Sequence, residues 1–455
     1  MRYIDSLKLK ETIECFILIE PGLGYIIPVL RERFKNGKII ALHIENHSHN
    51  DDSVENYAAG NAAICGAERS VVNKFLEKEV PEIDIDRIRV IEWRPSLNCY
   101  GEAYAALLSQ VVEFLKRLAA GKRTTAAFGK RWIRNFFRNL EKVSKIILYR
   151  QTDLPVIVTG SGPRLEQALP AIAGMQNSCL IIAASSSVMA LSSRGIKADI
   201  VITTDGGNWA LKHLTVTRHY DAVLAANLCA ALPSQTENSP FFVINDGSFW
   251  QSIVLSELAI PSIIIPQRGT VTSTAAELAM ILSSGNIYLA GMDFSNSGIR
   301  THVKPYAFDS IFFGRANRFM PVYTACFTRS ELLKEGGSMN IYASWFKDQL
   351  SSWQKHGERI FSLTDSDIFK KAIPENPAKI KNTDKIFSAK NIKEDTALFY
   401  QRGIDALSSA MNNPEFADNV KNELTTLLFA EGAKNVTKDE ILEELTKHRT
   451  VSNQE

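Results

Sequence analysis

The sequence of 455 residues has few cysteines and no long apolar run. Its six cysteines are scattered and form no Cys-x-x-Cys pair, so neither a disulfide framework nor a cysteine zinc knuckle is expected. No stretch of about 18 uncharged apolar residues occurs, which argues against a membrane-spanning helix. The first residues carry charges in every turn and do not predict a secretory signal. These absences predict a soluble, cytoplasmic protein with no transmembrane segment.

A strong net charge and the common nucleotide motifs are also missing. Lys and Arg number 52 against 50 Asp and Glu, so the net charge of +2 does not indicate a nucleic-acid or membrane partner. No Gly-x-x-x-x-Gly-Lys-Ser/Thr occurs, which disfavours a P-loop ATPase. Metal-dependent glycosyltransferases carry an Asp-x-Asp pair directly after a strand. Here Asp84/Asp86 precedes a predicted strand, and Asp365/Asp367 lies in a predicted loop. We therefore expect chemistry without a divalent metal.

The composition that remains is typical of a large globular α/β protein, with 45% hydrophobic and 22% charged residues. Four regions differ in their pattern of apolar, polar and charged residues. They predict a Rossmann-like domain at 1–100, a basic helical connector at 101–150, a central catalytic domain at 151–335 and a helical domain at 336–455. In the last region, Thr437 and Glu440 form a capping box ahead of an amphipathic helix.

Seven short apolar runs alternate with helical segments in the central region. They lie at 156–159, 179–184, 199–204, 222–227, 241–245, 262–266 and 286–290. This alternation predicts βαβ units and a mostly parallel sheet covered on both faces. Three further runs at 15–20, 38–45 and 87–93, with a helix at 26–34, predict a smaller sheet in the N-terminal domain.

The connector has one apolar and one cationic face. Ile133, Phe136, Phe137 and Leu140 are spaced i, i+3, i+4 and i+7, while Lys and Arg far outnumber the acids around them. Nucleic-acid binding by this helix is conceivable, but no recognisable DNA or RNA module accompanies it. We expect it to pack against the protein, with an acidic partner surface as the alternative.

Ligands of open parallel sheets bind beyond the carboxyl ends of the strands. Here those ends carry small or polar residues: Gly160, Ser161, Gly162, Pro163, Arg164, Ser185, Asp205, Asn227, Thr270, Gly291 and Asp293. The turn at Gly160 is the strongest candidate for an anion site. Its glycines let the backbone approach a phosphate closely, and the N–H groups at the start of a helix favour negative charge. Leu165 replaces the third glycine of a dinucleotide motif, which disfavours NAD.

Catalytic groups are expected at the same edge of the sheet. Asp205 and Asp293 are carboxylates at strand ends, where the backbone holds a general base or a ribose ligand rigidly. Of the eight histidines, His302 is best placed to exchange a proton near neutral pH, on a polar loop soon after Asp293. A surface histidine without a role is the alternative.

The N-terminal domain has a weaker candidate. Gly22 and Gly24 follow a predicted strand, and Glu45 ends the next one, where a ribose-binding acid belongs. A degenerate Rossmann-like scaffold without a ligand is favoured. His47 and His49 lie in a polar stretch, which a solvated loop explains better than a metal site with an unidentified third ligand.

Several motifs together resemble the motility accessory factor (Maf) proteins. They are residues 156–165 (VIVTGSGPRL), 182–185 (IAAS), 195–199 (GIKAD), 269–273 (GTVTS) and 287–293 (IYLAGMD), followed by Thr301 and His302. The resemblance is strongest over about 151–305. It implies a central domain similar to the archaeal 6-hydroxymethylpterin diphosphokinase MptE. Arg164 and Ser185 depart from the Ser and Asn of the family pattern.

The resemblance implies a flagellin glycosyltransferase of the bacterial flagellum. Maf proteins move a nonulosonic acid, such as pseudaminic acid, from a CMP-activated donor to Ser or Thr of flagellin. The implied fold is a Rossmann-like, mostly parallel sheet with a sialyltransferase-like site that requires no cofactor or metal.

The resemblance also implies roles for the residues at the strand ends. Gly160 to Pro163 would contact the phosphate, and Ser185, Asp205 and Asn227 the cytidine and ribose. His302 would be the base, with Asp205 or Asp293 as substitutes. Arg300 would offset charge on the sugar carboxylate or the leaving phosphate. The N-terminal domain and C-terminal helices would recognise flagellin.

Two other functions are open. A pterin-type pyrophosphokinase would use ATP and Mg²⁺, with Asp205 and Asp293 as metal ligands. A non-catalytic flagellin-binding assembly factor would show no turnover, and the departures at Arg164 and Ser185 fit it.

Overall fold

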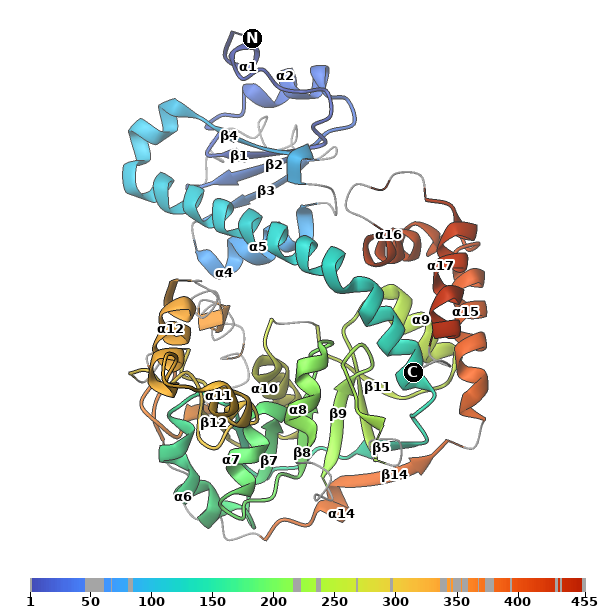
Figure 1. The fold of residues 1–455 in the computed structure, drawn as a ribbon. Helices are drawn as coiled ribbons and strands as arrows, with labels where there is room; N and C mark the ends of the chain where they lie inside the picture. Colours follow the sequence, from blue (N-terminus) through green and yellow to red (C-terminus); the bar gives the residue numbers. More distant parts are fainter. Residues whose placement is uncertain are drawn as a thin grey trace. The chain divides into compact units, whose positions relative to one another are not determined.

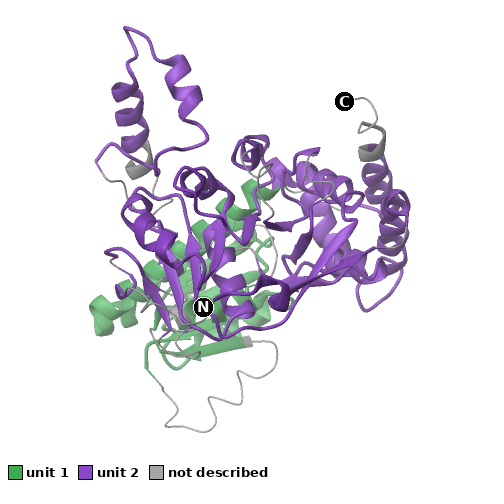
Figure 2. Ribbon diagram, turned by 90° about the horizontal axis from the view of Figure 1, so that it is seen from below, with its two compact units in different colours: residues 1–125 green, residues 126–455 purple. Residues whose placement is uncertain are grey.

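The computed structural model describes residues 2–45, 61–66, 68–80, 85–215, 222–234, 239–266, 269–294, 298–335, 342–343, 345–346, 353, 359–366, 368–372, 380–392, 395–429, 433 and 436–451. The chain forms two compact units, residues 1–125 and 126–455, drawn in green and purple in Figure 2. The boundary lies within the long helix α5 (Arg94–Leu140), inside the segment predicted to be a connector.

Unit 1 is a small α/β domain with four parallel strands in the order β3-β2-β1-β4. Its elements are α1 (Arg2–Ser6), β1 (Cys15–Ile19), α2 (Ile26–Arg33), β2 (Lys38–His43), β3 (Asn61–Cys65), α4 (Arg69–Glu79), β4 (Ile88–Glu92) and the first part of α5 (Figure 1). Ile17 and Ile19 face α4 and α5, whereas Phe16 and Leu18 face α1 and α2. Successive side chains of a strand point to opposite faces, so both faces of this sheet are buried.

Unit 2 contains the central sheet, in the order β13-β12-β6-β7-β8-β9-β10-β5-β14, with β11 also paired to β10 (Figure 1). The strands are β5 (Lys145–Tyr149), β6 (Val156–Thr159), β7 (Leu180–Ala184), β8 (Ile200–Thr203), β9 (Val223–Asn227), β10 (Phe241–Asn245), β11 (Ser262–Ile264), β12 (Ile287–Ala290), β13 (Ile360–Ser362) and β14 (Phe387–Asn391). Every pair is parallel except β14 with β5. Each of the seven predicted runs contains one of the strands β6 to β12, which confirms the mostly parallel sheet.

Helices cover this sheet on both sides. The described α-helices of unit 2 after α5 are α6 (Leu165–Met175), α7 (Val188–Ser192), α8 (Leu211–Leu214), α9 (Phe249–Glu257), α10 (Val271–Leu282), α11 (Asp309–Arg315), α12 (Val322–Glu335), α14 (Thr383–Ile386), α15 (Phe399–Ala410), α16 (Ala417–Leu428) and α17 (Lys438–Val451), of which α11 and α12 do not pack on the sheet. Ile157 and Ile181 join a core with α5, α6, α9 and the C-terminal helices, whereas Val158 and Ile182 pack with α10. The continuous apolar runs in the sequence result from this burial on both faces.

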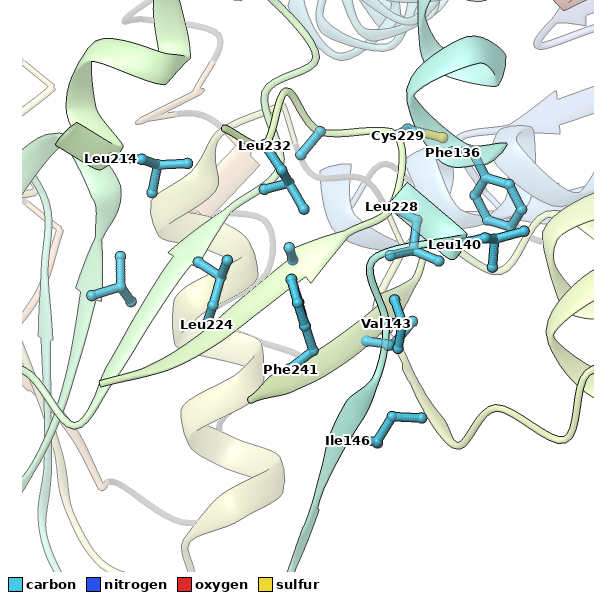
Figure 3. Close-up of a cluster of buried hydrophobic side chains, with 14 of the residues drawn as sticks. Phe136, Leu140, Val143, Ile146, Leu214, Leu224, Leu228, Cys229, Leu232 and Phe241 are labelled. Carbon is cyan, nitrogen blue, oxygen red and sulfur yellow. The ribbon is translucent and has the colours of Figure 1, made fainter. Parts of the chain in front are cut away.

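The carboxyl half of α5 belongs to the first of these cores. Ile133, Phe136, Phe137 and Leu140 are all buried, which confirms the predicted apolar face. Figure 3 shows Phe136 and Leu140 beside Leu228, which directly follows β9. The cations of the other face stay at the surface; Lys130, for example, pairs with Glu444 on α17 at 2.5 Å.

The sequence analysis was wrong about part of the connector and the C-terminal region. The helix predicted over 101–150 ends at Leu140, and Lys145–Tyr149 is strand β5. Two further strands, β13 and β14, come from the region predicted to be helical and join opposite edges of the central sheet. β3 was not predicted. These strands lie at or next to sheet edges, where burial and hence the apolar pattern are weaker.

The C-terminal helices agree with their prediction. Thr437 and Glu440 cap α17 reciprocally: the Thr437 N–H donates to the Glu440 carboxylate at 2.7 Å, and the Glu440 N–H donates to Thr437 Oγ1 at 3.2 Å. In the part of the chain that the structure describes, no helix combines the length and apolarity needed to cross a membrane.

Candidate functional site

The topology of the central sheet marks one edge position as the candidate site. From β6 the chain adds β7, β8, β9 and β10 on one side and then returns to place β12 on the other side of β6. In open α/β sheets, ligands bind beyond the carboxyl ends of the strands at such a switch point. The turn after β6 carries Gly160 and Gly162, and the turn after β12 carries Gly291 and Asp293.

Glycines let these two turns touch each other. A Cβ on Gly160 would lie 2.6 Å from the carbonyl oxygen of Gly291, and one on Gly162 would lie 2.5 Å from Oδ2 of Asp293. Gly291 has φ of +67° and would in turn meet the carbonyl oxygen of Gly160 at 2.5 Å. These three positions therefore require glycine for packing between two segments of backbone.

The N–H groups at the start of α6 already have partners, contrary to the expectation of free donors for a phosphate. The Gly162 N–H donates to the Gly291 carbonyl at 2.8 Å, and the Arg164 N–H donates to Oδ2 of Asp293 at 2.7 Å. The Asp293 carboxylate thus occupies the anion position at this helix start. The Arg164 side chain donates to the carbonyl of Asp365 at 2.7 Å.

His302 lies beside this turn, as the sequence analysis predicted. The N–H of the next residue, Val303, donates to the Ser161 carbonyl at 2.9 Å, which fixes the histidine loop against the glycine turn. Nδ1 of His302 lies 2.9 Å from the Thr301 hydroxyl. The imidazole stacks on the ring of Tyr306, with centroids 4.2 Å apart and planes inclined by 21°.

A second histidine, which the sequence analysis did not single out, also contacts this group. His213 on α8 packs against Tyr306 and Phe308, with ring centroids 5.2 and 5.0 Å apart. Its Nδ1 is buried and has no hydrogen-bond partner among the described residues. Tyr306 therefore contacts both imidazoles, and Asp205 is close enough to His213 to act on its charge.

Burial keeps both imidazoles neutral. Burial is the main cause that lowers the pKa of His302 to about 3, and the charges of Arg329, His213 and Lys304 contribute to the same decrease. It lowers the pKa of His213 to about 4, against the opposing effect of the Asp205 charge. The same burial raises the pKa of Tyr306 to about 12 and also raises the pKa of Asp293, whose carboxylate the Arg164 N–H partly stabilises. A neutral imidazole is the form that can accept a proton.

Hydroxyl groups follow the strands next to the glycine turn. The hydroxyls of Thr159, the last residue of β6, and Ser187 lie 2.8 Å apart and are both buried. The Thr203 hydroxyl, at the end of β8, is buried without a hydrogen-bond partner in the described part of the chain. Ser185, the predicted cytidine or ribose contact, is also buried, in the turn that follows β7.

The other predicted residues have structural partners. Oδ1 of Asn227 accepts the Cys229 N–H at 2.7 Å, and Oδ1 of the exposed Asp205 accepts the Gly207 N–H at 2.8 Å. Thr270 caps α10 by accepting the Ser273 N–H. Arg300 pairs with Glu166 at 2.8 Å, so its charge is already balanced on α6.

Helix α5 fastens the loops after β8 and β9. Nδ2 of Asn135 donates to the carbonyl oxygens of Gly206 and Cys229, and Nδ2 of Asn139 donates to those of Leu228 and Ala230, both at 2.8 Å. Trp132 fills the space where Gly206 has no Cβ. The sequence analysis noted α5 for its charges, but it is the side-chain amides of Asn135 and Asn139 that hold these loops in place.

The N-terminal turn lies at the strand ends of the smaller sheet. Gly22 and Gly24 have φ of +61° and +74°, and the neighbouring Tyr25 is exposed. The buried Glu20 carboxylate accepts the Ile44 N–H and lies 3.4 Å from Nδ1 of His43. Ligand binding at this turn stays a prediction. His47, His49, Asp84 and Asp367 lie outside the described residues.

The residues that the sequence analysis missed are His213, Tyr306 and Thr203. None of them belongs to a recognisable motif. The available signal for Thr203 was its position at the carboxyl end of a predicted strand. His213 and Tyr306 come from a short helix and a loop, and only the fold brings them to His302.

Comparisons with known proteins agree with this architecture. Residues 130–298 match the family described as 6-hydroxymethylpterin diphosphokinase MptE-like. An uncharacterized protein of Treponema pallidum (strain Nichols) is 26% identical over 279 residues, which span 60% of this chain and 60% of that relative. A solved structure, the MAf glycosyltransferase from Magnetospirillum magneticum AMB-1, is similar with a TM-score of 0.51 and 14% identity, covering 96% of this chain and 73% of that one. The chain thus has the fold of that protein, and residues 130–298 are similar to the MptE-like family.

Proposed function

We propose that this chain, an MptE-like domain within a Maf-type fold, is a glycosyltransferase that moves a nonulosonic acid from a CMP-activated donor to Ser or Thr of flagellin. The observation that carries the proposal is the convergence at the switch point of the glycine turn, a neutral imidazole and buried hydroxyl groups. The similarity to a Maf glycosyltransferase supports the reaction class. The donor and the acceptor come from the resemblance of the motifs.

The donor phosphate needs an anion site other than the start of α6, because Asp293 occupies that position. Helix α10 offers one. A Cβ on Gly160 would lie 3.2 Å from the Thr272 side chain, so the amino end of α10 borders the same turn. A helix of 12 residues presents a partial positive charge there, which favours a phosphate. Ser185 and Thr203 would contact the nucleoside.

His302 would act as the general base. The acceptor hydroxyl attacks the anomeric carbon, the bond to the CMP oxygen breaks, and the hydroxyl proton passes to Nε2 of His302. The low pKa of His302 makes it a weak base in the free protein. A bound donor, which carries a phosphate and a carboxylate, would raise this pKa because negative charge stabilises the imidazolium. Donor binding would thus strengthen the base.

Nucleotide binding is the first test of this function. We expect CMP at about 100 times its Kd to stabilise the protein by about 2.7 kcal/mol, with the shift unchanged in EDTA. The second measurement is release of CMP from CMP-nonulosonate in the presence of flagellin. We expect His302→Ala to lower transfer about 10²- to 10⁴-fold while the CMP shift persists. Full transfer by this variant would rule out His302 as the base.

A pterin-type pyrophosphokinase is the second candidate, because the matched family is described by that activity. It would use ATP and Mg²⁺, with Asp205 and Asp293 as the carboxylates. Asp293 already accepts the Arg164 N–H and Asp205 the Gly207 N–H. A thermal shift with ATP that requires Mg²⁺, without one for CMP, would favour this candidate. No shift with any nucleotide would favour a flagellin-binding assembly factor.

A further inference from the structure

We propose that the hairpin formed by α11 and α12 docks the protein acceptor, through an acceptor segment whose face is apolar with acidic residues at its edge. This inference rests on the proposed function, since it assigns the acceptor surface of that site. It differs from the expectation that the N-terminal domain and the C-terminal helices recognise the acceptor. Figure 2 shows the hairpin projecting from the rest of unit 2.

The hairpin is apolar yet contributes nothing to the core. None of the residues from 310 to 329 is buried. Five large apolar side chains are exposed on it: Phe319 by 88%, Tyr323 by 66%, Phe313 by 54%, Met320 by 50% and Phe327 by 49%. Together they equal about three fully exposed side chains, or roughly 600 Å² at about 200 Å² each. A standard protein interface buries about 800 Å² on each partner, so this surface supplies most of one.

The polar residues of the hairpin also match a protein interface. Residues 310–330 contain Arg315, Arg318 and Arg329 but no Lys, Asp or Glu. Interfaces are enriched in aromatic residues, Met and Arg and depleted of Lys, Asp and Glu. Arg315 and Arg318 are exposed and form no ion pair with any residue that the structure describes. An acidic partner would complement them.

The sign of this charge argues against a second copy of the chain as the occupant. Two copies of the segment 310–330 packed on each other would bring cations against cations, because this segment contains no Asp or Glu. An anionic membrane surface is a separate possibility. The scarcity of cations beyond these arginines, and the absence of lysine from 310–330, favour a protein partner over a lipid surface, which attracts polybasic segments.

The base of the hairpin is part of the candidate site. Asp309, the first residue of α11, accepts the Tyr306 N–H at 2.9 Å and pairs with Lys304. On α12, Arg329 acts on both Tyr306 and His302. A polypeptide bound along the hairpin would thus lie next to the imidazole proposed to deprotonate its hydroxyl. The hairpin places the acceptor without taking part in the chemistry.

Direct binding tests this proposal without depending on turnover. Fluorescently labelled flagellin monomer is titrated with the full chain and its variants. We expect the double variants Phe319→Glu/Tyr323→Glu and Arg315→Glu/Arg318→Glu each to weaken binding at least tenfold. Leu398→Glu, which alters a 58% exposed apolar residue elsewhere in unit 2, is the matched control and should bind normally. Circular dichroism and the unfolding temperature confirm that each variant folds.

Donor hydrolysis separates docking from catalysis. CMP release from CMP-nonulosonate without flagellin should be the same in the wild type and the hairpin variants. If the wild type releases no CMP and transfers no sugar, the proposed function fails, whereas tenfold weaker flagellin binding by the variants still supports the docking surface. Unchanged flagellin binding by both double variants overturns it. If flagellin binding is unchanged but the variants no longer sediment with phosphatidylglycerol vesicles, the surface binds a membrane instead. If flagellin binding is unchanged but the variants no longer form dimers in ultracentrifugation, the surface binds a second copy of the chain.

Discussion

Gly162 is held between the Gly291 carbonyl and the Asp293 carboxylate, at 2.7 and 2.5 Å from the position of a Cβ. Neither neighbour can retreat easily, because the first is backbone and the second is hydrogen-bonded to Arg164. We therefore expect Gly162→Ala to lower the free energy of unfolding by about 1–3 kcal/mol, as overpacked sites do. Urea denaturation measures this loss.

Gly174 provides the control at the same scale. It lies inside α6, and a Cβ there would meet nothing within 4 Å. Gly174→Ala should stabilise the protein by about 0.5–1 kcal/mol, because alanine restricts the unfolded chain and favours the helix. If both substitutions have the same effect, the close approach of the two turns does not determine stability.

The buried imidazoles predict how stability depends on pH. The pKa values of His302 and His213 fall to about 3 and about 4 in the folded chain, below the unfolded value of about 6.5. Between about pH 6.5 and pH 4, the unfolded state therefore binds more protons, and the free energy of unfolding must decrease as the pH falls. Both groups are neutral in either state above pH 7, where this effect ends.

Unfolding by urea at pH 7 and at pH 5 measures this dependence. His213→Phe keeps an aromatic ring against Tyr306 and Phe308 but removes one titrating group. The difference in unfolding free energy between the two pH values should be smaller in this variant than in the wild type. An equal difference would show that His213 is not responsible for the acid sensitivity.

At the scale of elements, α5 determines the position of the loops that border the site. Asn139 donates to the carbonyl oxygens of Leu228 and Ala230, which are completely buried. Asn139→Ala would leave both carbonyls without these donors, so we expect a loss of about 1–3 kcal/mol in the free energy of unfolding. Arg138→Ala, at the exposed neighbouring position, should change it by less than about 0.5 kcal/mol. Thermal or urea denaturation of both variants distinguishes the two outcomes.

Agreement between prediction and structure also varies by element. Strands β6 to β10 and β12 were predicted because burial on both faces makes them continuous apolar runs, whereas β11 is a short apolar run that is only partly buried. β14 was missed since four of its five residues are exposed, and its sequence FSAKN has no apolar pattern. β5 was assigned to the basic helix because Lys145 and Arg150 enclose a short apolar run that fits either element.

At the scale of the whole molecule, the two sheets have separate cores. The cores on the two faces of the central sheet contain only residues of unit 2, from Ile133 onward. We expect residues 126–455 produced alone to fold, with one cooperative thermal transition, and to keep the CMP-induced shift. Circular dichroism and the thermal-shift assay check this. A molten chain without a transition would show that unit 1 is required for folding.

The sequence by itself determined the parallel sheets and the positions of the glycine turn, Asp293 and His302 beyond the strand ends. Burial on both faces of a strand, and the change from apolar to polar residues where the strand ends, leave a local pattern in the sequence. Only the tertiary structure decided that Asp293 occupies the anion position at α6, that Arg300 is paired with Glu166, and that His213 and Tyr306 complete the group around His302. These contacts join residues from 4 to 134 positions apart through the packing of strands and loops, and sequence spacing holds no information about which side chains that packing brings together.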